Sequence, residues 1–240
     1  MYVIEKFRLI KLYIVFFSLI TGPCVGIAQI RLTEEVSFAS KYIWRGYNIA
    51  DTPVMQPSVT LEEETTGLSV NIWGSAALSD RGEFDTADEL DFTLTYSTSF
   101  VENVEFTAGS IFYTFPTQYP FDFDNHTTFE LFFTASPSNL PVNTELTVYY
   151  DFNLGDDLYA SIKLNDNVPL SGLSVGYSVG IGYNNGQFGS ERGISDIVVA
   201  VDSAFLLKNL TIAPGFQCIL TPEDSVNPDN EIVLSVSIGR

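Results

Sequence analysis

The charged residues of this 240-residue chain recur at alternate positions in segments that are otherwise apolar, aromatic or small. Near the start of the chain, Phe38, Tyr42 and Trp44 occupy even positions, whereas Lys41 and Arg45 occupy odd ones. A β-strand directs alternate side chains to opposite faces, so such a strand has one apolar face and one charged face. Followed along the chain, the same alternation places on the charged face the residues Glu35, Lys41, Arg45, Glu62, Glu89, Asp91, Glu130, Glu145, Asp151 and Lys163.

Acids and bases on the inner face of a closed sheet would meet across its interior, where a charge is costly unless it is paired or hydrated. We expect Lys41 and Arg45 to project from the first strand toward Glu62, Glu89 or Asp91. Two roles fit this pattern: a charged constriction that sorts solutes by sign and size, or a set of ion pairs that plugs the interior. The interior of a barrel of about twelve strands is intermediate between one filled by side chains and an open channel. The sequence therefore does not decide between the two roles.

Residues suited to catalysis or metal binding are few. The only histidine, His126, follows an acidic loop, where a lone histidine is more often a surface residue than a general base. The acidic pairs Asp122 with Asp124 and Asp224 with Asp229 would bind calcium only loosely, and we interpret them as solvated loop residues. The sequence therefore predicts a protein that is not an enzyme and that binds no metal or cofactor.

The N-terminus has the organisation of an export signal. A basic region with Lys6, Arg8 and Lys11 precedes the apolar run of residues 12–20, and a small-residue cleavage site ends at Ala28. We predict a signal peptide over residues 1–28; a single membrane anchor is the weaker alternative because the apolar run is short. The formal net charge of −19 and the absence of a basic patch argue against a nucleic-acid partner.

The rest of the chain, residues 29–240, is predicted to form one all-β domain. Alternation interrupted by turn residues predicts strands near 34–45, 56–63, 68–78, 88–98, 104–113, 127–135, 144–151, 158–165, 173–183, 194–203, 210–221 and 231–238. Short turns alternate with longer acidic or aromatic loops, so the long loops should emerge at one end. Strands of about ten alternating residues are typical of a transmembrane antiparallel β-barrel, here of about twelve strands. A secreted β-sandwich or lipocalin-like barrel is the alternative.

Several short motifs resemble the TorF family of porins, which are small outer-membrane barrels of Gram-negative bacteria. The resemblance is densest over residues 37–135, and it includes Gly67, the acidic pair Glu89 and Asp91, and residues 113–116. The positions that carry it most specifically are Tyr42, Trp44, Arg45, Gly46, Pro53, Gln56, Trp73, Gly74 and Ser75. The chain departs from outer-membrane barrels in general by ending on Arg240 rather than on an aromatic residue.

The resemblance and the strand pattern together predict an outer-membrane porin for passive diffusion of small solutes. Because acids outnumber bases on the charged face, the channel should be weakly cation-selective. The expected partners are outer-membrane lipid, small solutes and the barrel-assembly machinery. The alternatives are a plugged structural or adhesion barrel that acts through its acidic outer loops and, less favoured, a lipid-modifying enzyme at the rim that rests on His126.

Overall fold

The computed structural model describes residues 29–79, 88–116, 127–170 and 173–240. The predicted signal peptide and His126 therefore lie outside the described residues. Within them, no helix is long and apolar enough to cross a bilayer.

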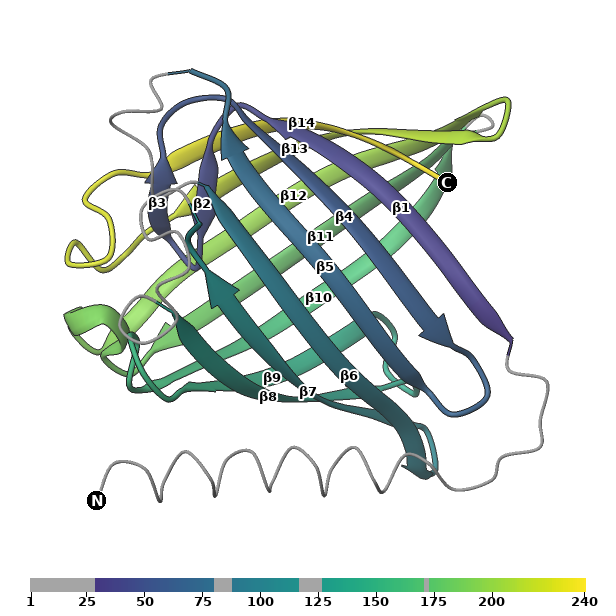
Figure 1. The fold of residues 1–240 in the computed structure, drawn as a ribbon, viewed down its shortest axis with the longest axis horizontal. Coiled ribbons are helices and arrows are strands. Elements are labelled where there is room, and N and C mark those ends of the chain that lie inside the picture. Colours follow the sequence, from purple (N-terminus) through teal and green to yellow (C-terminus); the bar gives the residue numbers. More distant parts are fainter. Residues whose placement is uncertain (1–28, 80–87, 117–126, 171–172) are drawn as a thin grey trace.

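Twelve antiparallel strands close into a barrel, which confirms the predicted fold class (Figure 1). In spatial order each strand pairs with the next along the chain, and β1 closes the ring by pairing with both β4 and β14. The strands are β1 (Ile30–Ala39), β4 (Val54–Glu63), β5 (Leu68–Ala77), β6 (Glu89–Val101), β7 (Val104–Thr114), β8 (Thr128–Pro137), β9 (Asn143–Asp151), β10 (Leu158–Leu170), β11 (Leu173–Asn184), β12 (Gly193–Leu207), β13 (Leu210–Leu220) and β14 (Glu231–Gly239).

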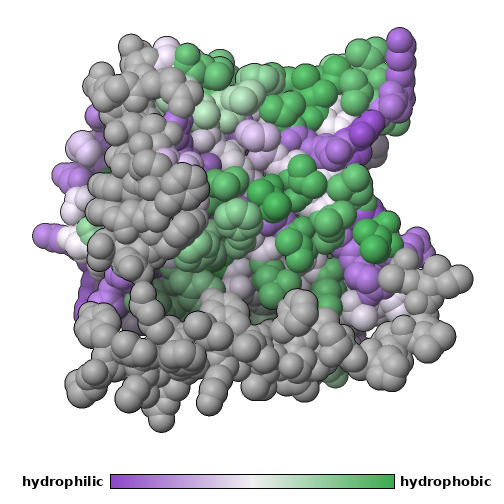
Figure 2. Space-filling model, viewed as in Figure 1, coloured by the Kyte–Doolittle hydropathy of each residue, from purple (hydrophilic) through white to green (hydrophobic). Residues whose placement is uncertain are grey.

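The outer surface of the barrel is apolar along the middle of its strands. Large side chains there, including Leu131, Phe133, Val179 and Ile181, are 40–48% exposed. Figure 2 shows hydrophobic side chains gathered over the middle of the visible strands, with hydrophilic ones toward the ends. A continuous apolar band of this kind would be unfavourable in water, whereas hydrocarbon solvates it well. The band therefore identifies the outer surface as a membrane-facing one.

The inner surface is polar, as the sequence alternation predicts. On β9 and β12, Thr147 and Asp196 are 7% and 5% exposed, while Val148 and Val199, at positions of the opposite parity, are 45% and 43% exposed on the outer face. One parity separates the two surfaces along most of each strand, and β12 changes parity only at a bulge near Ser195. A register shift of one residue elsewhere would therefore place charges in lipid. The apolar band and the polar interior thus specify the strand register together.

The ends of the barrel differ in the length of their connections. Short turns at residues 64–67, 102–103, 138–142 and 208–209 lie at one end, and the longer connections lie at the other. In this second group, the segment between β1 and β4 contains two further strands, β2 (Tyr42–Trp44) and β3 (Tyr47–Ala50), which form a separate sheet.

The prediction of one strand over residues 34–45 is therefore wrong at its end. Strand β1 stops at Ala39, and the chain then turns into the barrel as the β2–β3 hairpin (Figure 1). The two-residue connection Arg45-Gly46 has positive φ angles of 50° and 88°, which is the geometry of a type I′ turn. Alternation continues through the hairpin, so the sequence pattern alone does not mark the break.

Candidate functional site

The hairpin of residues 42–50, called the inner hairpin below, is anchored at its base by a small apolar cluster. Ala50, Val54 and Ala77 are completely buried, and Tyr42 is 9% exposed. The Tyr42 ring also lies 5.7 Å from the ring of Trp73 on β5. Burial of these side chains holds the base of the hairpin against β4 and β5.

The tip of the inner hairpin reaches the opposite wall. A Cβ atom at Gly46 would lie 2.6 Å from the backbone carbonyl oxygen of Ser195 on β12, closer than atoms can approach. Position 46 therefore requires glycine both for its positive φ and for this close approach. The hairpin consequently crosses the barrel interior from β4 and β5 to β12.

An ion pair between Arg45 and Glu130 fixes the tip to the wall. The guanidinium donates two hydrogen bonds of 2.6 and 2.8 Å to the two carboxylate oxygens, and the side chains are 8% and 0% exposed. Glu130 also accepts a hydrogen bond of 2.8 Å from the Tyr113 hydroxyl, and Arg45 donates one of 3.1 Å to the Gln187 side chain. Two parallel bonds to one carboxylate set the position and the orientation of the arginine.

Three aromatic rings surround the same guanidinium. Its central carbon lies 4.4, 4.2 and 4.4 Å from the ring centroids of Trp44, Tyr149 and Tyr159. Burial is the largest single influence and by itself lowers the pKa of Arg45. The hydrogen bonds and charge of Glu130, together with Tyr113 and Tyr149, outweigh it, so the pKa is raised above its ordinary value. Arg45 is therefore a permanent cation, held by a carboxylate and by aromatic faces.

Lys41 fixes the entry to the hairpin by a second set of ion pairs. Its ammonium lies 2.5 Å from Asp51 and 2.7 Å from Glu231, which begins β14. Asn48 of the hairpin donates a hydrogen bond of 2.8 Å to the same Glu231. The hydrogen bond to Asp51, followed by that to Glu231, raises the pKa of Lys41 above 10.5.

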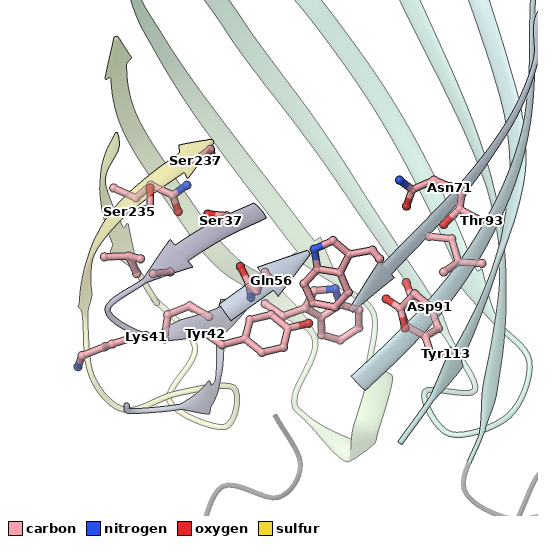
Figure 3. A pocket seen from close by; sticks show the side chains of 17 residues that line it. Ser37, Lys41, Tyr42, Gln56, Asn71, Asp91, Thr93, Tyr113, Ser235 and Ser237 are labelled. Carbon is pink, nitrogen blue, oxygen red and sulfur yellow. The ribbon is translucent and has the colours of Figure 1, made fainter. Parts of the chain in front are cut away.

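A cavity of about 510 Å³ lies between the inner hairpin and the wall formed by β1, β4–β7, β13 and β14. Figure 3 shows serines of β1 and β14 on one side and Asn71, Thr93 and Asp91 on the other, with Tyr42 between them. The cavity has both apolar and polar lining, as sites for small molecules commonly do.

The two bases predicted for the inner face have partners other than the expected ones. Lys41 and Arg45 pair with Asp51, Glu231 and Glu130 instead of Glu62, Glu89 or Asp91. The expected pairing is wrong because both bases leave the first strand with the hairpin.

The remaining acids are distributed along the barrel axis. Glu89 accepts a hydrogen bond of 2.8 Å from the Tyr42 hydroxyl, and Asp91 lines the cavity. Glu62 lies 3.9 Å from Arg31 near the short turns. Glu35 is exposed and lies opposite Gly239 where β1 meets β14.

Two further predicted positions face each other across neighbouring strands. Glu145 and Lys163 are register partners on β9 and β10, and Glu145 accepts a hydrogen bond of 3.2 Å from Asn165.

Asp151 organises the rim instead of standing free in the interior. It is completely buried and accepts a hydrogen bond of 2.6 Å from the Thr128 hydroxyl. It also accepts bonds of 2.8 and 2.9 Å from the backbone N–H groups of Asn153 and Gly155. These bonds shape the connection between β9 and β10, so Asp151 contributes to the rim structure.

The positions that carry the TorF resemblance gather around the inner hairpin. Four form it or its turn, and the others lie on or beside the strands it packs against: Tyr42, Trp44, Arg45, Gly46, Pro53, Gln56, Trp73, Gly74 and Ser75. The sequence reasoning missed Gln187, Tyr149 and Tyr159, whose contacts with Arg45 arise only when distant strands meet.

Solved structures with the same fold are outer-membrane barrels. The KdgM porin aligns with a TM-score of 0.55 at 9% identity, covering 86% of this chain and 97% of that one. The NanC porin aligns with a TM-score of 0.51 at 10% identity, covering 87% of this chain and 98% of that one. A bacterial polysaccharide outer membrane secretin aligns with a TM-score of 0.51 at 9% identity, covering 88% of this chain and 96% of that one. At these identities the likeness establishes the fold alone.

No curated protein matches the sequence. A family model described as a bacterial protein of unknown function (Gcw_chp) matches residues 26–215, a span that includes the inner hairpin and most of the barrel strands. This chain belongs to that family.

Proposed function

We propose that the protein is a diffusion channel for small solutes in the outer membrane of a Gram-negative bacterium, with the inner hairpin as its constriction. The observation that carries this proposal is a closed barrel, apolar outside, that encloses a cavity of about 510 Å³ with polar and apolar lining. The fold shared with the KdgM and NanC porins and the motif resemblance to TorF-family porins support it.

The charges beside the constriction favour cations. The Arg45 guanidinium is already paired with Glu130. Glu89 and Asp91 face the interior nearby, with Asp91 on the cavity wall, and their side chains are hydrogen-bonded to each other. A hydrogen bond between two carboxyl groups needs a proton on one of them, so this pair contributes one negative charge. Carboxylates along a narrow path raise the local concentration of cations and repel anions. The channel is therefore weakly cation-selective, and the selectivity weakens as salt shortens the screening length from about 10 Å at about 0.1 M to about 3 Å at about 1 M.

A plugged barrel is the second candidate, and the same hairpin favours it. The Arg45 and Glu130 side chains are 8% and 0% exposed, and Gln187 beside them is fully buried. If this seal is permanent, the interior conducts nothing and the outer loops carry the function.

Single-channel recording in planar bilayers tests the two candidates. The unmodified protein is compared with a variant in which residues 42–50 are replaced by a short Gly-Ser linker. A channel constricted by the hairpin conducts in both forms, with larger steps in the variant. Conductance in the variant alone supports the plug, and no conductance in either form, with a folded barrel, overturns the channel.

Reversal potentials across a salt gradient test the selectivity on the same preparation. Cation preference should fall in the double variant Glu89→Gln, Asp91→Asn. Anion preference in the unmodified channel, or an unchanged potential in the variant, would contradict the assignment of the selective charges. A lipid-hydrolysis assay of the same sample tests the prediction that the protein is not an enzyme.

A further inference from the structure

We propose that the cavity beside the inner hairpin binds a neutral saccharide of about one or two sugar rings. This inference rests on the proposed channel function, because a solute must enter the barrel to reach the cavity. Its volume of about 510 Å³ falls within the range of about 300–1,000 Å³ that is typical of small-molecule sites.

The cavity presents uncharged donors and acceptors on two facing walls. Ser37 on β1 is the register partner of Gln56 on β4 and of Ser237 on β14, so the three polar groups form one row. On the other wall, Asn71 and Thr93 are register partners on β5 and β6 (Figure 3). Hydroxyl and amide groups both donate and accept hydrogen bonds, which matches the alternating donors and acceptors of a sugar.

Aromatic rings supply the apolar part of the site. Tyr42 and Trp73 line the cavity with their centroids 5.7 Å apart and their planes inclined at 58°. The C–H face of a sugar ring packs favourably on such a surface while its hydroxyls reach the polar walls. Ring and amide groups together therefore suit a molecule with one apolar face and a polar edge.

Asp91 provides an acceptor that the protein itself leaves partly unused. Its side chain lines the cavity and the residue is 8% exposed, yet its Oδ1 atom has no hydrogen-bond partner among the described residues. A buried carboxylate oxygen without a donor is unfavourable, so a ligand hydroxyl that reached this carboxylate would be stabilised. The hydrogen-bonded pair of Glu89 and Asp91 retains one negative charge beside the cavity, which disfavours acidic sugars by repulsion.

A cationic amine is the competing ligand, because it too would approach Asp91. An ammonium group only donates hydrogen bonds, however, and would leave the amide donors of Gln56 on the cavity wall unused. The prevalence of uncharged groups that both donate and accept favours the neutral polyhydroxylated molecule.

Intrinsic fluorescence offers a direct test, since the two tryptophans of the chain, Trp44 and Trp73, both line the cavity. The purified barrel in detergent is titrated with maltose, galacturonate and glucosamine. We expect a saturable change in emission with maltose, at least about tenfold weaker binding of galacturonate, and about tenfold weaker maltose binding in Asp91→Asn. Gln56→Ala is a second variant that should weaken binding without removing a charge.

Ser97→Ala is the matched control, because Ser97 lies on the inner face of β6, the strand that carries Asp91, but closer to the short turns. It should bind maltose as the unmodified protein does. Saturation by glucosamine alone, equal binding of galacturonate, or no saturable change with maltose overturns the saccharide site. Conductance of the same sample separates the two proposals: a conducting barrel that does not bind maltose contradicts only this inference, and a non-conducting barrel that binds it contradicts only the channel.

Discussion

Arg45 and Glu130 are 85 positions apart in the chain, yet they meet through two hydrogen bonds of 2.6 and 2.8 Å inside the barrel. The pair joins the tip of the inner hairpin to β8 and lies among the rings of Trp44, Tyr149 and Tyr159. The position of the hairpin in the interior therefore depends strongly on one ion pair with almost no contact with solvent.

Substitution Arg45→Ala should release the hairpin from the wall and increase the conductance of the barrel. Loss of one partner of a buried ion pair costs roughly 3–5 kcal/mol because the other charge remains buried and unpaired. If the hairpin moves away from the wall, water in the interior reaches Glu130, and this cost is avoided. Single-channel recordings should show larger and noisier current steps than those of the unmodified protein.

The control for this substitution is Arg192→Ala, which removes an exposed arginine that bonds to the carbonyl oxygen of Asn185 on a loop at the same end. It should leave the current steps unchanged. The double variant Arg45→Ala, Glu130→Ala should regain part of the lost stability. Equal conductance of Arg45→Ala and the unmodified protein would show that the pair does not hold the constriction.

Charges introduced on the two faces of one strand should have unequal effects on folding. Val179 on β11 is 41% exposed on the outer face, and its neighbour Ser178 faces inward. Val179→Arg should lower the free energy of unfolding by roughly 2–4 kcal/mol near the membrane midplane, whereas Ser178→Arg should change it much less. Urea unfolding in lipid vesicles measures both, and equal losses would contradict the assigned faces.

The ion pairs of Lys41 should make the stability depend on pH in the alkaline range. Its pKa is raised in the folded protein, so its stabilising contribution is complete below the unfolded value of about 10.4 and is lost as the pH rises through the folded pKa. The difference in unfolding free energy between the unmodified protein and Lys41→Met should be constant from about pH 7 to about pH 10 and should shrink above that.

Lys41→Arg serves as the comparison, since a guanidinium keeps its charge at these pH values. Its advantage over Lys41→Met should persist above about pH 10. A difference between the unmodified protein and Lys41→Met that does not change with pH would mean that the ion pairs contribute nothing measurable.

The closed barrel should also be visible in its behaviour on gels and in cell fractions. A ring of twelve strands without a free edge resists detergent until it is heated, so the unheated band should migrate differently from the boiled one. The protein should fractionate with the outer membrane. Recovery as a soluble periplasmic protein, with no shift on heating, would contradict the membrane location.

The sequence by itself determined the strands and their two faces. The alternation in residues 173–183 predicts β11 to within one residue and correctly orients Val179, because side-chain parity is a local property of an extended chain. The same reasoning predicted the number of barrel strands, since each one carries its own pattern and is followed by turn residues.

Only the tertiary structure decided the positions and the partners of the basic residues in the interior. Lys41 and Arg45 follow the alternation of the first strand, but Arg45-Gly46 forms a tight turn, and the hairpin that it closes enters the interior. The sequence does not distinguish this path from a longer strand, because the partners that stabilise it, Glu130 and Gln187, come from strands and loops far away in the chain. Closure of the barrel brings these groups together, and burial then makes the Arg45–Glu130 pair costly to separate.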